Sequence, residues 1–428
     1  MSIHHLLNHD IVCDCGKVHR CDISSVIICQ GAIDQLPQAV EKYNHILLVA
    51  DNNTYPLCGD RVKQVLKGKV ENCHVFQTEG FLVPNEQSSK TVDDLVTDKT
   101  DLVLGIGSGV INDICKYVAF FRKIKSGIVA TAPSMDGYAS SGAAMILGGM
   151  KVTVATSAPD LIIGDVDVLK NAPMDMIGAG YGDIIGKYSS LNDWKLSHLI
   201  NGEHFCPAIY KITLDATNEI RSLANEIINR EPYAIGKLME TLCATGICLT
   251  LAGYTRPGSG SEHHLSHFFE ITGLIEDKPY FLHGTDVGYS TIITAEIREK
   301  IRTVKTPIFH KITDEQRKAC YKKIYKNYDK EVWDIQEKEG RYKTDVSKKY
   351  IENWDKVKEI LAECPTADQF RDMLKDFGFE FYKLEQMYGE EKIRNSAFFG
   401  KDLKDRYTVL WLYCDLFLTD AEIKRTLN

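Results

Sequence analysis

The chain has 428 residues, of which 44% are hydrophobic and 26% charged, and its formal net charge at pH 7 is -8. This length exceeds what one hydrophobic core usually holds and predicts two domains. The acidic balance, with a pI near 5.9, excludes a nucleic-acid binder, which needs a basic surface.

The sequence also gives no indication of a membrane-spanning segment or an export signal. We find no run of about 18 consecutive apolar residues. Residues 1–5 lack the charged and apolar regions that begin a signal peptide. We therefore expect a cytoplasmic protein without a membrane partner.

The thirteen cysteines are scattered along the chain, and their number is odd. Without secretory features, this usage predicts mostly buried thiols rather than a disulfide framework. Cys13, Cys15 and His19 form a Cys-x-Cys-x3-His group. No second Cys or His pair follows nearby at zinc-finger spacing, so the spacing argues against a metal role there.

The first part of the chain alternates short apolar runs with helical patterns. The runs are residues 45–50, 73–76, 102–106 and 127–131, and the helical patterns include residues 62–66 and 111–118. Such alternation predicts βαβ units and a Rossmann-like, mostly parallel sheet with helices on both faces. We predict an α/β dinucleotide-binding domain over residues 1–168, with ligands at the carboxyl ends of its strands.

Asp51 follows the first apolar run. A carboxylate at this point of a dinucleotide fold accepts hydrogen bonds from the adenosine ribose and repels a 2'-phosphate. The residue favours NAD over NADP.

A glycine-rich turn follows the third run, where a strand passes into a helix. Residues 105–113 read Gly-Ile-Gly-Ser-Gly-Val-Ile-Asn-Asp. Glycines let the backbone approach a phosphate, and the first amides of the helix would bind a pyrophosphate. The spacing is not the Rossmann pattern, because Val110 stands where a glycine is expected. A tight turn without a ligand is the alternative.

A loop dense in hydroxyl groups follows the fourth run. Residues 131–142 read Thr-Ala-Pro-Ser-Met-Asp-Gly-Tyr-Ala-Ser-Ser-Gly and include one carboxylate, Asp136. A loop at the carboxyl end of a strand can contact both a cofactor and a polyol substrate. An ordinary surface turn is the alternative.

From about residue 172 the pattern becomes helical. The amphipathic stretches are residues 177–194, 209–229, 234–252, 262–272 and 288–302, followed by charged ones to the C-terminus. We predict an all-helical domain over residues 169–428 that holds the metal and substrate. Residues 314–348, rich in Lys, Glu, Asp and Tyr, are interpreted as a solvated helix face.

Asp183 follows three glycines at the apparent start of the first of these helices. An N-cap role would explain it. A catalytic metal held by histidines also needs an anionic oxygen ligand, which an Asp on a neighbouring helix would supply. The residue pattern leaves both readings open.

Four histidines lie within the 21 residues from His263 to His283. His263 and His267 share one helix face because they are four residues apart. Neutral imidazole is a common ligand for zinc, nickel and iron. The concentration predicts a metal site, although any one of these histidines could be an ordinary core or surface residue.

Taken in order, these motifs resemble the bacterial sn-glycerol-1-phosphate dehydrogenases. These belong to the larger set of iron-type alcohol dehydrogenases, glycerol dehydrogenases and 3-dehydroquinate synthases. The resemblance runs from about Ile27 to the C-terminus and includes residues 159–163, 192–194 and 405–410. One departure is Gly-Ser-Gly at residues 107–109, where three glycines are commoner. The resemblance implies a dehydroquinate synthase-like fold and a homodimer.

The resemblance also implies residue roles. Metal ligation would fall on Asp183, His263 and His283, and substrate contacts on Asp136, Asp183 and His267. Nucleotide contacts would fall on Asp51, Gly107, Ser108, Gly109, Val110, Ile111, Asn112, Asp113, Thr131, Ala132, Pro133, Ser134 and Ser140. The cofactors would be NAD, with NADP as the alternative, and one divalent metal, Zn, Ni or Fe.

The implied reaction is reversible, metal-dependent reduction of dihydroxyacetone phosphate by NAD(P)H. His267 and Asp136 are the candidate catalytic residues. His267 would relay the hydroxyl proton, or it would only form hydrogen bonds beside the metal ligands. Lys187 and Arg256 are candidate cations for the phosphate. A dehydrogenase of glycerol or another polyol is the near alternative, and a non-catalytic nucleotide-binding protein the remote one.

Overall fold

The computed structural model describes residues 3–80 and 82–428. The chain divides into two compact units. Unit 1 comprises Met1–Ile184 and Lys211–Thr255, and unit 2 comprises Ile185–Tyr210 and Arg256–Asn428.

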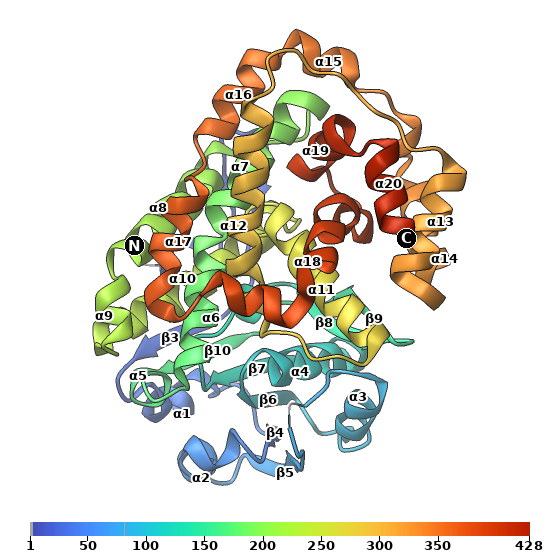
Figure 1. Ribbon diagram of the computed structural model, residues 1–428. Coiled ribbons are helices and arrows are strands. Elements are labelled where there is room, and N and C mark those ends of the chain that lie inside the picture. Colours follow the sequence, from blue (N-terminus) through green and yellow to red (C-terminus); the bar gives the residue numbers. More distant parts are fainter. Residues whose placement is uncertain (1–2, 81) are drawn as a thin grey trace. The chain divides into compact units, whose positions relative to one another are not determined.

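Unit 1 is built on a six-stranded sheet in the order β3-β10-β7-β6-β4-β5 (Figure 1). All of its strand pairs are parallel. The strands are β3 (Ser25–Cys29), β4 (Ile46–Asp51), β5 (Val70–Phe76), β6 (Leu102–Gly107), β7 (Lys125–Ala130) and β10 (Leu161–Asp165). The central strands are continuous apolar runs because helices cover both faces of a parallel sheet. The predicted parallel sheet is confirmed.

The helices that follow these strands are α1 (Leu36–Ala39), α2 (Tyr55–Val65), α3 (Glu86–Asp93), α4 (Gly109–Arg122) and α5 (Val166–Leu169). Helices α2 and α4 carry the helical patterns predicted at residues 62–66 and 111–118. Two antiparallel hairpins lie outside the main sheet, β1 (Ile11–Val12) with β2 (Val18–His19) and β8 (Gly142–Leu147) with β9 (Met150–Ala155). Neither hairpin was predicted from the sequence, and β3 was not predicted either.

The units divide at a different point from the predicted boundary after residue 168. Helices α6 (Met174–Ile185) and α10 (Pro232–Ala252) belong almost wholly to unit 1. A Cβ on Gly180 of α6 would lie 1.9 Å from the carbonyl oxygen of Pro133, and one on Gly246 of α10 would lie 2.8 Å from that of Asp136. Both helices therefore pack directly on the loop after β7, which keeps them with the sheet.

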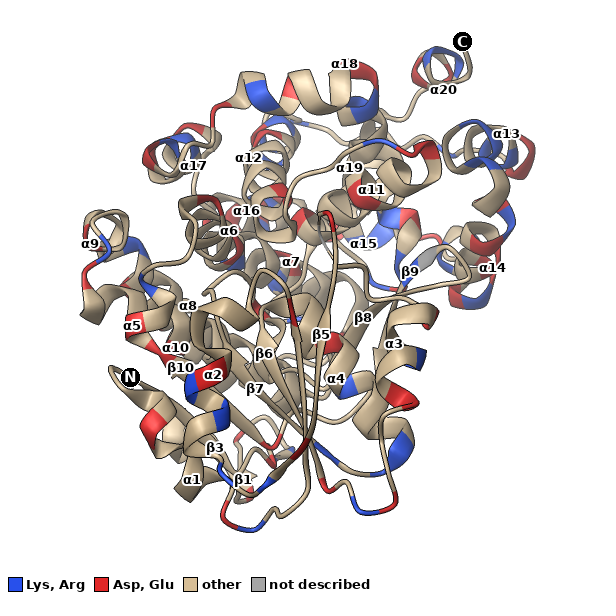
Figure 2. Cartoon of the chain, turned by 90° about the horizontal axis from the view of Figure 1, so that it is seen from below, with Lys and Arg blue, Asp and Glu red and all other residues tan. Residues whose placement is uncertain are grey.

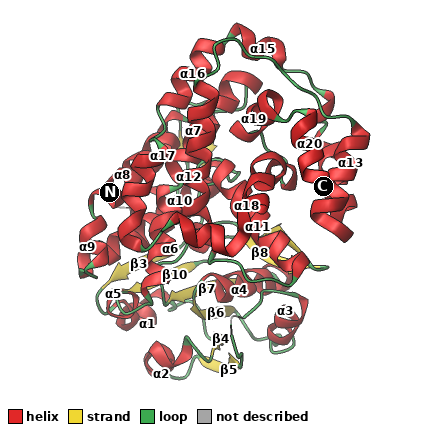
Figure 3. Ribbon diagram, in the orientation of Figure 1, coloured by secondary structure: helices red, strands yellow, loops and turns green. Residues whose placement is uncertain are grey.

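Past β10, the described residues are helical or irregular and include no strand (Figure 3). The helical C-terminal region is therefore confirmed. Helices α8 (Pro207–Ser222) and α9 (Ala224–Ile228) precede α10, and unit 2 contains α7 (Lys187–Asn201), α11 (Ser261–Glu276), α12 (His283–Arg302), α13 (Asp314–Tyr325), α14 (Asp329–Glu339), α15 (Ser347–Glu352), α16 (Trp354–Ala362), α17 (Ala367–Leu374), α18 (Phe381–Phe399), α19 (Val409–Phe417) and α20 (Asp420–Leu427). The stretch predicted as one helix over residues 177–194 is two helices, which meet at Gly186.

Charges of both signs run along α13 and α14 (Figure 2). Most of these side chains are exposed, as predicted for a solvated face.

Among the described residues, α10 is the one helix long and apolar enough to cross a membrane, although 78% of its most apolar window is buried inside the protein. Lys237 and Glu240 interrupt its apolar residues, so the helix does not contradict the expectation that the sequence has no run of about 18 consecutive apolar residues. Leu238, Leu242 and Cys243 lie in the core. A core helix of a large domain passes the same composition test as a membrane span.

Candidate functional site

In unit 1, three neighbouring strands end at the same edge of the sheet. Strand β6 lies between β4 and β7, and all three run in parallel. Asp51 is the last residue of β4, and its Oδ1 accepts hydrogen bonds from the backbone amides of Asn53 (2.9 Å) and Thr54 (2.8 Å). The Thr54 hydroxyl donates to the carbonyl of Ile106 at 2.8 Å, which joins the ends of β4 and β6.

The glycine turn passes from β6 into α4. A Cβ on Gly107 would lie 2.6 Å from the side chain of Ile111, and one on Gly109 would lie 2.8 Å from that of Met135. Ser108 is the N-cap residue, but its side chain makes no capping hydrogen bond. The amides of Gly109, Val110 and Ile111 therefore begin a 14-residue helix without a side-chain cap, which is the arrangement that binds an anion.

The next two residues of the turn have structural partners. The Asn112 side chain is buried and its amide donates to the carbonyls of Gly137 (3.4 Å) and Tyr138 (3.5 Å). Asp113 pairs with the buried Lys116 at 3.0 Å. Burial raises the pKa of Asp113, and the Lys116 charge opposes that shift. In this region, the backbone of the turn is a better candidate for phosphate contact than these two side chains.

The hydroxyl-rich loop after β7 is held from several sides. The amide of Thr131 donates to the carbonyl of Gly107 at 3.0 Å. Tyr138 donates to the carbonyl of Ala132 at 2.7 Å, and Ser140 donates to that of Gly137 at 3.1 Å. Ala132 and Pro133 are buried, whereas Ser134 is half-buried. The loop is therefore a fixed part of the sheet edge rather than an ordinary surface turn.

Asp183 is fully buried in the last turn of α6. Asp183 was predicted to lie at a helix start, but α6 begins at Met174, so the N-cap interpretation is wrong. Its Oδ2 accepts a hydrogen bond from the backbone amide of Asp136 at 2.9 Å. Asp136 is itself buried, so these two predicted substrate residues are neighbours. Asp183 and Asp136 both lie in unit 1.

In unit 2, the three predicted site histidines lie together. His263 and His267 are on α11, and His283 is the first residue of α12. The ring centroids of His263 and His283 are 5.1 Å apart, and those of His267 and His283 are 5.5 Å apart. A ring nitrogen of His263 lies within 4.8 Å of one of His283. This spacing allows both imidazoles to bind one ion.

His263 is held in a form suited to metal binding. Its Nδ1 lies 2.8 Å from Oε1 of the fully buried Glu262, which also accepts from the amide of Gly260 at 2.7 Å. Burial lowers the pKa of His263 well below its usual value, and the Lys187 charge and His283 lower it further. A neutral imidazole that donates Nδ1–H to a carboxylate presents Nε2 as a lone-pair donor.

Glu262 was not assigned a role from the sequence. Its position next to His263 could have indicated this role, because a carboxylate directly before a ligand histidine can reach that ring's second nitrogen. His283 has a different neighbour, since Ser266 Oγ lies 3.4 Å from His283 Nδ1. His264, the fourth histidine of this stretch, is fully buried.

His267 has a cation beside it. Lys404 Nζ lies 3.4 Å from His267 Nε2 and 3.5 Å from the hydroxyl of Ser259. The Arg406 guanidinium donates to the carbonyl of Ser259 at 3.2 Å. Lys404 was not predicted from the sequence, although it directly precedes residues 405–410, which carry part of the resemblance.

The two cations suggested for a phosphate have other partners. Arg256 is buried and forms a bidentate pair with Glu203, with distances of 2.8 and 2.6 Å. Lys187 is buried and donates to the carbonyl of Gly258 at 2.9 Å. Both residues stabilise the segment that leads into α11, so their role is structural.

Comparison with known proteins defines the class. The family model described as iron-containing alcohol dehydrogenase matches residues 27–173. A probable glycerol dehydrogenase from Sinorhizobium meliloti has a similar structure, with a TM-score of 0.60, 16% identity and coverage of 95% of this chain and 96% of that one. A maleylacetate reductase from Agrobacterium tumefaciens gives a TM-score of 0.61 at 12% identity, with 96% of each chain covered. The fold is that of the dehydroquinate synthase-like and iron-type alcohol dehydrogenases.

Sequence relatives narrow the class to one family. A glycerol-1-phosphate dehydrogenase [NAD(P)+] from Halalkalibacterium halodurans is 37% identical over 304 residues, which are 68% of this chain and 76% of that protein. One from Geobacillus thermodenitrificans is 31% identical over 376 residues, which are 85% of this chain and 86% of that protein. The chain belongs to the glycerol-1-phosphate dehydrogenase family of oxidoreductases.

Proposed function

We propose that this enzyme reduces dihydroxyacetone phosphate to sn-glycerol 1-phosphate with NADH or NADPH, reversibly and with one divalent metal. The relatives named glycerol-1-phosphate dehydrogenase [NAD(P)+] support the substrate and the cofactor. The observation that carries the proposed metal dependence is the geometry of His263. Its Nδ1 lies 2.8 Å from Glu262, and a nitrogen of its ring lies within 4.8 Å of one of His283.

Asp183, His263 and His283 are the proposed ligands. One carboxylate and two imidazoles suit zinc, nickel and iron. A bound divalent ion supplies Lewis acidity to the substrate oxygen. The second oxygen of the Asp183 carboxylate accepts from Asp136 N–H, and such an outer hydrogen bond orients a ligand carboxylate.

The nucleotide is proposed to bind at the carboxyl edge of the sheet. The uncapped amides at the start of α4 would hold the pyrophosphate, and Asp51 would accept from the ribose. Thr131, Ala132, Pro133, Ser134 and Ser140 would complete the cofactor contacts. The carboxylate of Asp51 favours NAD over NADP, because a 2'-phosphate would place a second negative charge beside it.

In the reduction, a bound nicotinamide would supply hydride to the ketone carbon, and a proton would have to reach the ketone oxygen. We assign the proton delivery to His267 and substrate positioning to Asp136. The phosphate is assigned to Lys404, which neighbours His267, with Arg406 as a second cation. This replaces Lys187 and Arg256, because Lys187 Nζ and the Nε and Nη2 of Arg256 already donate hydrogen bonds within the protein.

The test is a kinetic panel with NADH and NADPH. Dihydroxyacetone phosphate, dihydroxyacetone, glycerol and both glycerol phosphate enantiomers are compared, with zinc, nickel or iron added. We expect the highest kcat/KM for dihydroxyacetone phosphate and, in reverse, for the 1-phosphate. Preference for glycerol would establish the polyol alternative, and NAD binding without turnover of any member would establish the non-catalytic one.

We also propose a homodimer. Light scattering should give about twice the chain mass of 48.2 kDa, whereas a mass equal to one chain would refute it.

A further inference from the structure

The N-terminal hairpin of unit 1 gathers three metal-ligating side chains outside the proposed catalytic site. Strands β1 and β2 pair Ile11 with His19 and Val12 with Val18. The connecting turn is closed by hydrogen bonds from Gly16 N–H to the Cys13 carbonyl (3.0 Å) and from Cys13 N–H to the Lys17 carbonyl (3.1 Å). Gly16 has a φ of +85°, which favours glycine.

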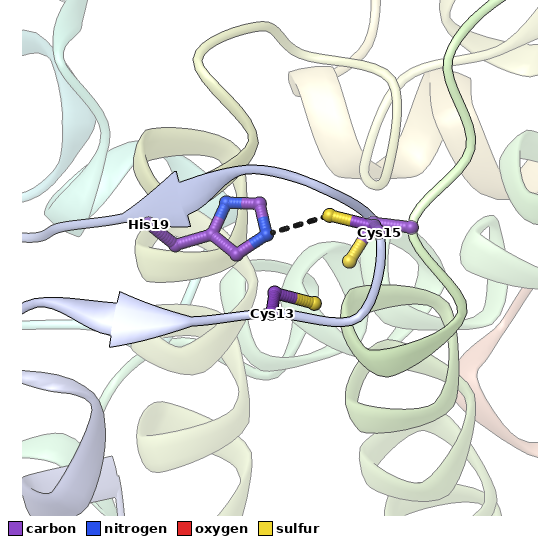
Figure 4. Close-up of side chains that lie close together, drawn as sticks. Cys13, Cys15 and His19 are labelled. Carbon is purple, nitrogen blue, oxygen red and sulfur yellow. Dashed lines mark hydrogen bonds between the residues drawn. The ribbon is translucent and has the colours of Figure 1, made fainter.

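This turn brings the donors together although only five residues separate Cys13 from His19. The Cys13 sulfur, the Cys15 sulfur and a ring nitrogen of His19 all lie within 4.8 Å of one another. The Cys15 sulfur is 3.3 Å from His19 Nε2, as the dashed line in Figure 4 marks. An ion at the common centre would be within bonding reach of all three after small side-chain rotations, since zinc–sulfur and zinc–nitrogen bonds are about 2.0–2.3 Å.

The histidine is oriented from its other side. His19 is buried, and its Nδ1 lies 2.6 Å from the backbone carbonyl of Leu251, near the C-terminal end of α10. A carbonyl only accepts, so Nδ1 carries the proton and Nε2 is the lone-pair donor that faces Cys15. Ligand histidines characteristically donate their second nitrogen to a carbonyl or carboxylate. The carbonyl end of a helix also favours a positive charge nearby.

The two cysteines differ from most others in the chain. Cys13 and Cys15 are half-buried, whereas Cys21, two residues beyond His19, is fully buried, and burial raises its pKa to about 11. Cys21 is thus a core thiol, while the hairpin pair is accessible to an ion.

We propose that Cys13, Cys15 and His19 bind a second divalent metal, of the zinc type, independently of the proposed catalytic metal. Two thiolates and one imidazole favour zinc over hard cations such as magnesium. Binding would release one proton from each thiol. The ion would connect the hairpin turn, through His19, to the end of α10. The absence of a second Cys or His pair at zinc-finger spacing argued against this site, but the spacing could not show that the turn brings both sulfurs close to a ring nitrogen of His19, whose other nitrogen is held by a carbonyl.

The experiment separates the two metals by stoichiometry. Full-length protein is loaded with zinc, freed of unbound metal and analysed by elemental mass spectrometry. We expect two zinc ions per chain in the unaltered protein and one in the Cys13→Ser/Cys15→Ser variant. A His263→Ala/His283→Ala variant should keep the hairpin ion, and Cys73→Ser, which removes a half-buried cysteine of β5, should keep both.

Cobalt identifies the ligands. Cobalt-loaded protein should show a thiolate-to-cobalt charge-transfer band in the near ultraviolet, retained in His263→Ala/His283→Ala and lost in Cys13→Ser/Cys15→Ser. If the proposed catalytic site holds no metal, His263→Ala/His283→Ala loses no zinc, and the cysteine variant still decides the hairpin site.

A measurement on the unaltered protein covers the case in which a variant misfolds. Zinc should slow alkylation of Cys13 and Cys15 relative to Cys73, as read by peptide mass spectrometry. Any further cysteine that binds the ion would be protected in the same digest. The proposal is overturned if zinc protects neither thiol, if cobalt gives no thiolate band, or if the two cysteines are recovered as a disulfide in freshly purified protein.

Discussion

At the scale of single residues, we expect Glu262 to determine how strongly the proposed ligand His263 binds a metal. Its buried carboxylate accepts from both His263 Nδ1 and Gly260 N–H. In Glu262→Gln the shape is kept but the charge that raises the basicity of the ring is lost. We expect zinc affinity at the His263 site to fall about 10- to 100-fold, measured by competition with a chromogenic chelator.

The matched control is Glu276→Gln, which neutralises a carboxylate at the far end of the same helix, where it pairs with Lys392. Equal zinc affinity in Glu262→Gln and the unaltered protein would show that the carboxylate does not support the ligand. Both variants should be measured in the Cys13→Ser/Cys15→Ser background, so that only one class of site is titrated.

Lys404 is the residue on which the phosphate assignment depends. In Lys404→Gln, we expect kcat/KM for dihydroxyacetone phosphate to fall about 10- to 100-fold, because a charge-assisted hydrogen bond contributes about 1.5–3 kcal/mol. Activity with dihydroxyacetone, which has no phosphate, should change little. Lys348→Gln, at an exposed position on α15, is the control. Equal losses with both substrates would mean that Lys404 supports His267 rather than a phosphate.

At the scale of elements, Asp160 joins the start of β10 to the segment before β3. Its buried carboxylate accepts from the Ser24 hydroxyl (2.8 Å) and the Tyr43 hydroxyl (2.7 Å), and it pairs with Lys42 at 2.8 Å. Burial raises the pKa of Asp160, but the hydrogen bonds from Lys42, Tyr43 and Ser24 outweigh it, and the net pKa is below the usual value.

Because the folded-state pKa is lower than the unfolded one, ionised Asp160 stabilises the fold above about pH 4, and this contribution is lost as pH falls through the folded pKa. Asp160→Asn should lower the free energy of unfolding by about 1.5–3 kcal/mol at neutral pH, and the difference from the unaltered protein should shrink toward pH 3. Urea denaturation across this range, with the exposed Asp98→Asn as control, measures it. A difference that stays constant with pH would contradict the ionic role.

An element could be predicted from the sequence where the pattern of neighbouring residues alone indicates it. The runs at residues 45–50 and 102–106 are short apolar segments flanked by turns, and they become β4 and β6. The break at Gly186 could not be predicted, because the residues on both sides suit a helix. Asp183 was misplaced because the glycines before it suggested a turn, whereas Gly180 allows α6 to pack on the Pro133 carbonyl.

The same distinction, between local patterns and contacts made only by the fold, applies to the candidate site. The three histidines of unit 2 were predicted to belong together, and the structure brings their rings together. Lys404 lies 137 residues beyond His267 in the sequence, so only the fold could reveal that pairing. His19 presents the same difficulty, since its partner Leu251 lies 232 residues away.

At the scale of the whole molecule, bound ligands should control stability. An ion or nucleotide that binds only the folded protein stabilises it by mass action, by about 2.7 kcal/mol at a hundredfold excess over Kd. Chelation should therefore lower the melting temperature and abolish reduction of dihydroxyacetone phosphate, and added zinc should restore both.

The two proposed metals can be separated in that melting experiment. In Cys13→Ser/Cys15→Ser, chelation should still abolish turnover, whereas the zinc-dependent rise in melting temperature should be smaller than in the unaltered protein. In His263→Ala/His283→Ala, turnover should be absent at every zinc concentration, yet zinc should still raise the melting temperature through the hairpin. NADH should stabilise both variants, because its proposed contacts lie on the sheet edge at Asp51 and the start of α4. A chelated enzyme that kept full turnover would refute the metal dependence, and a melting temperature insensitive to zinc in all three proteins would refute both metal sites.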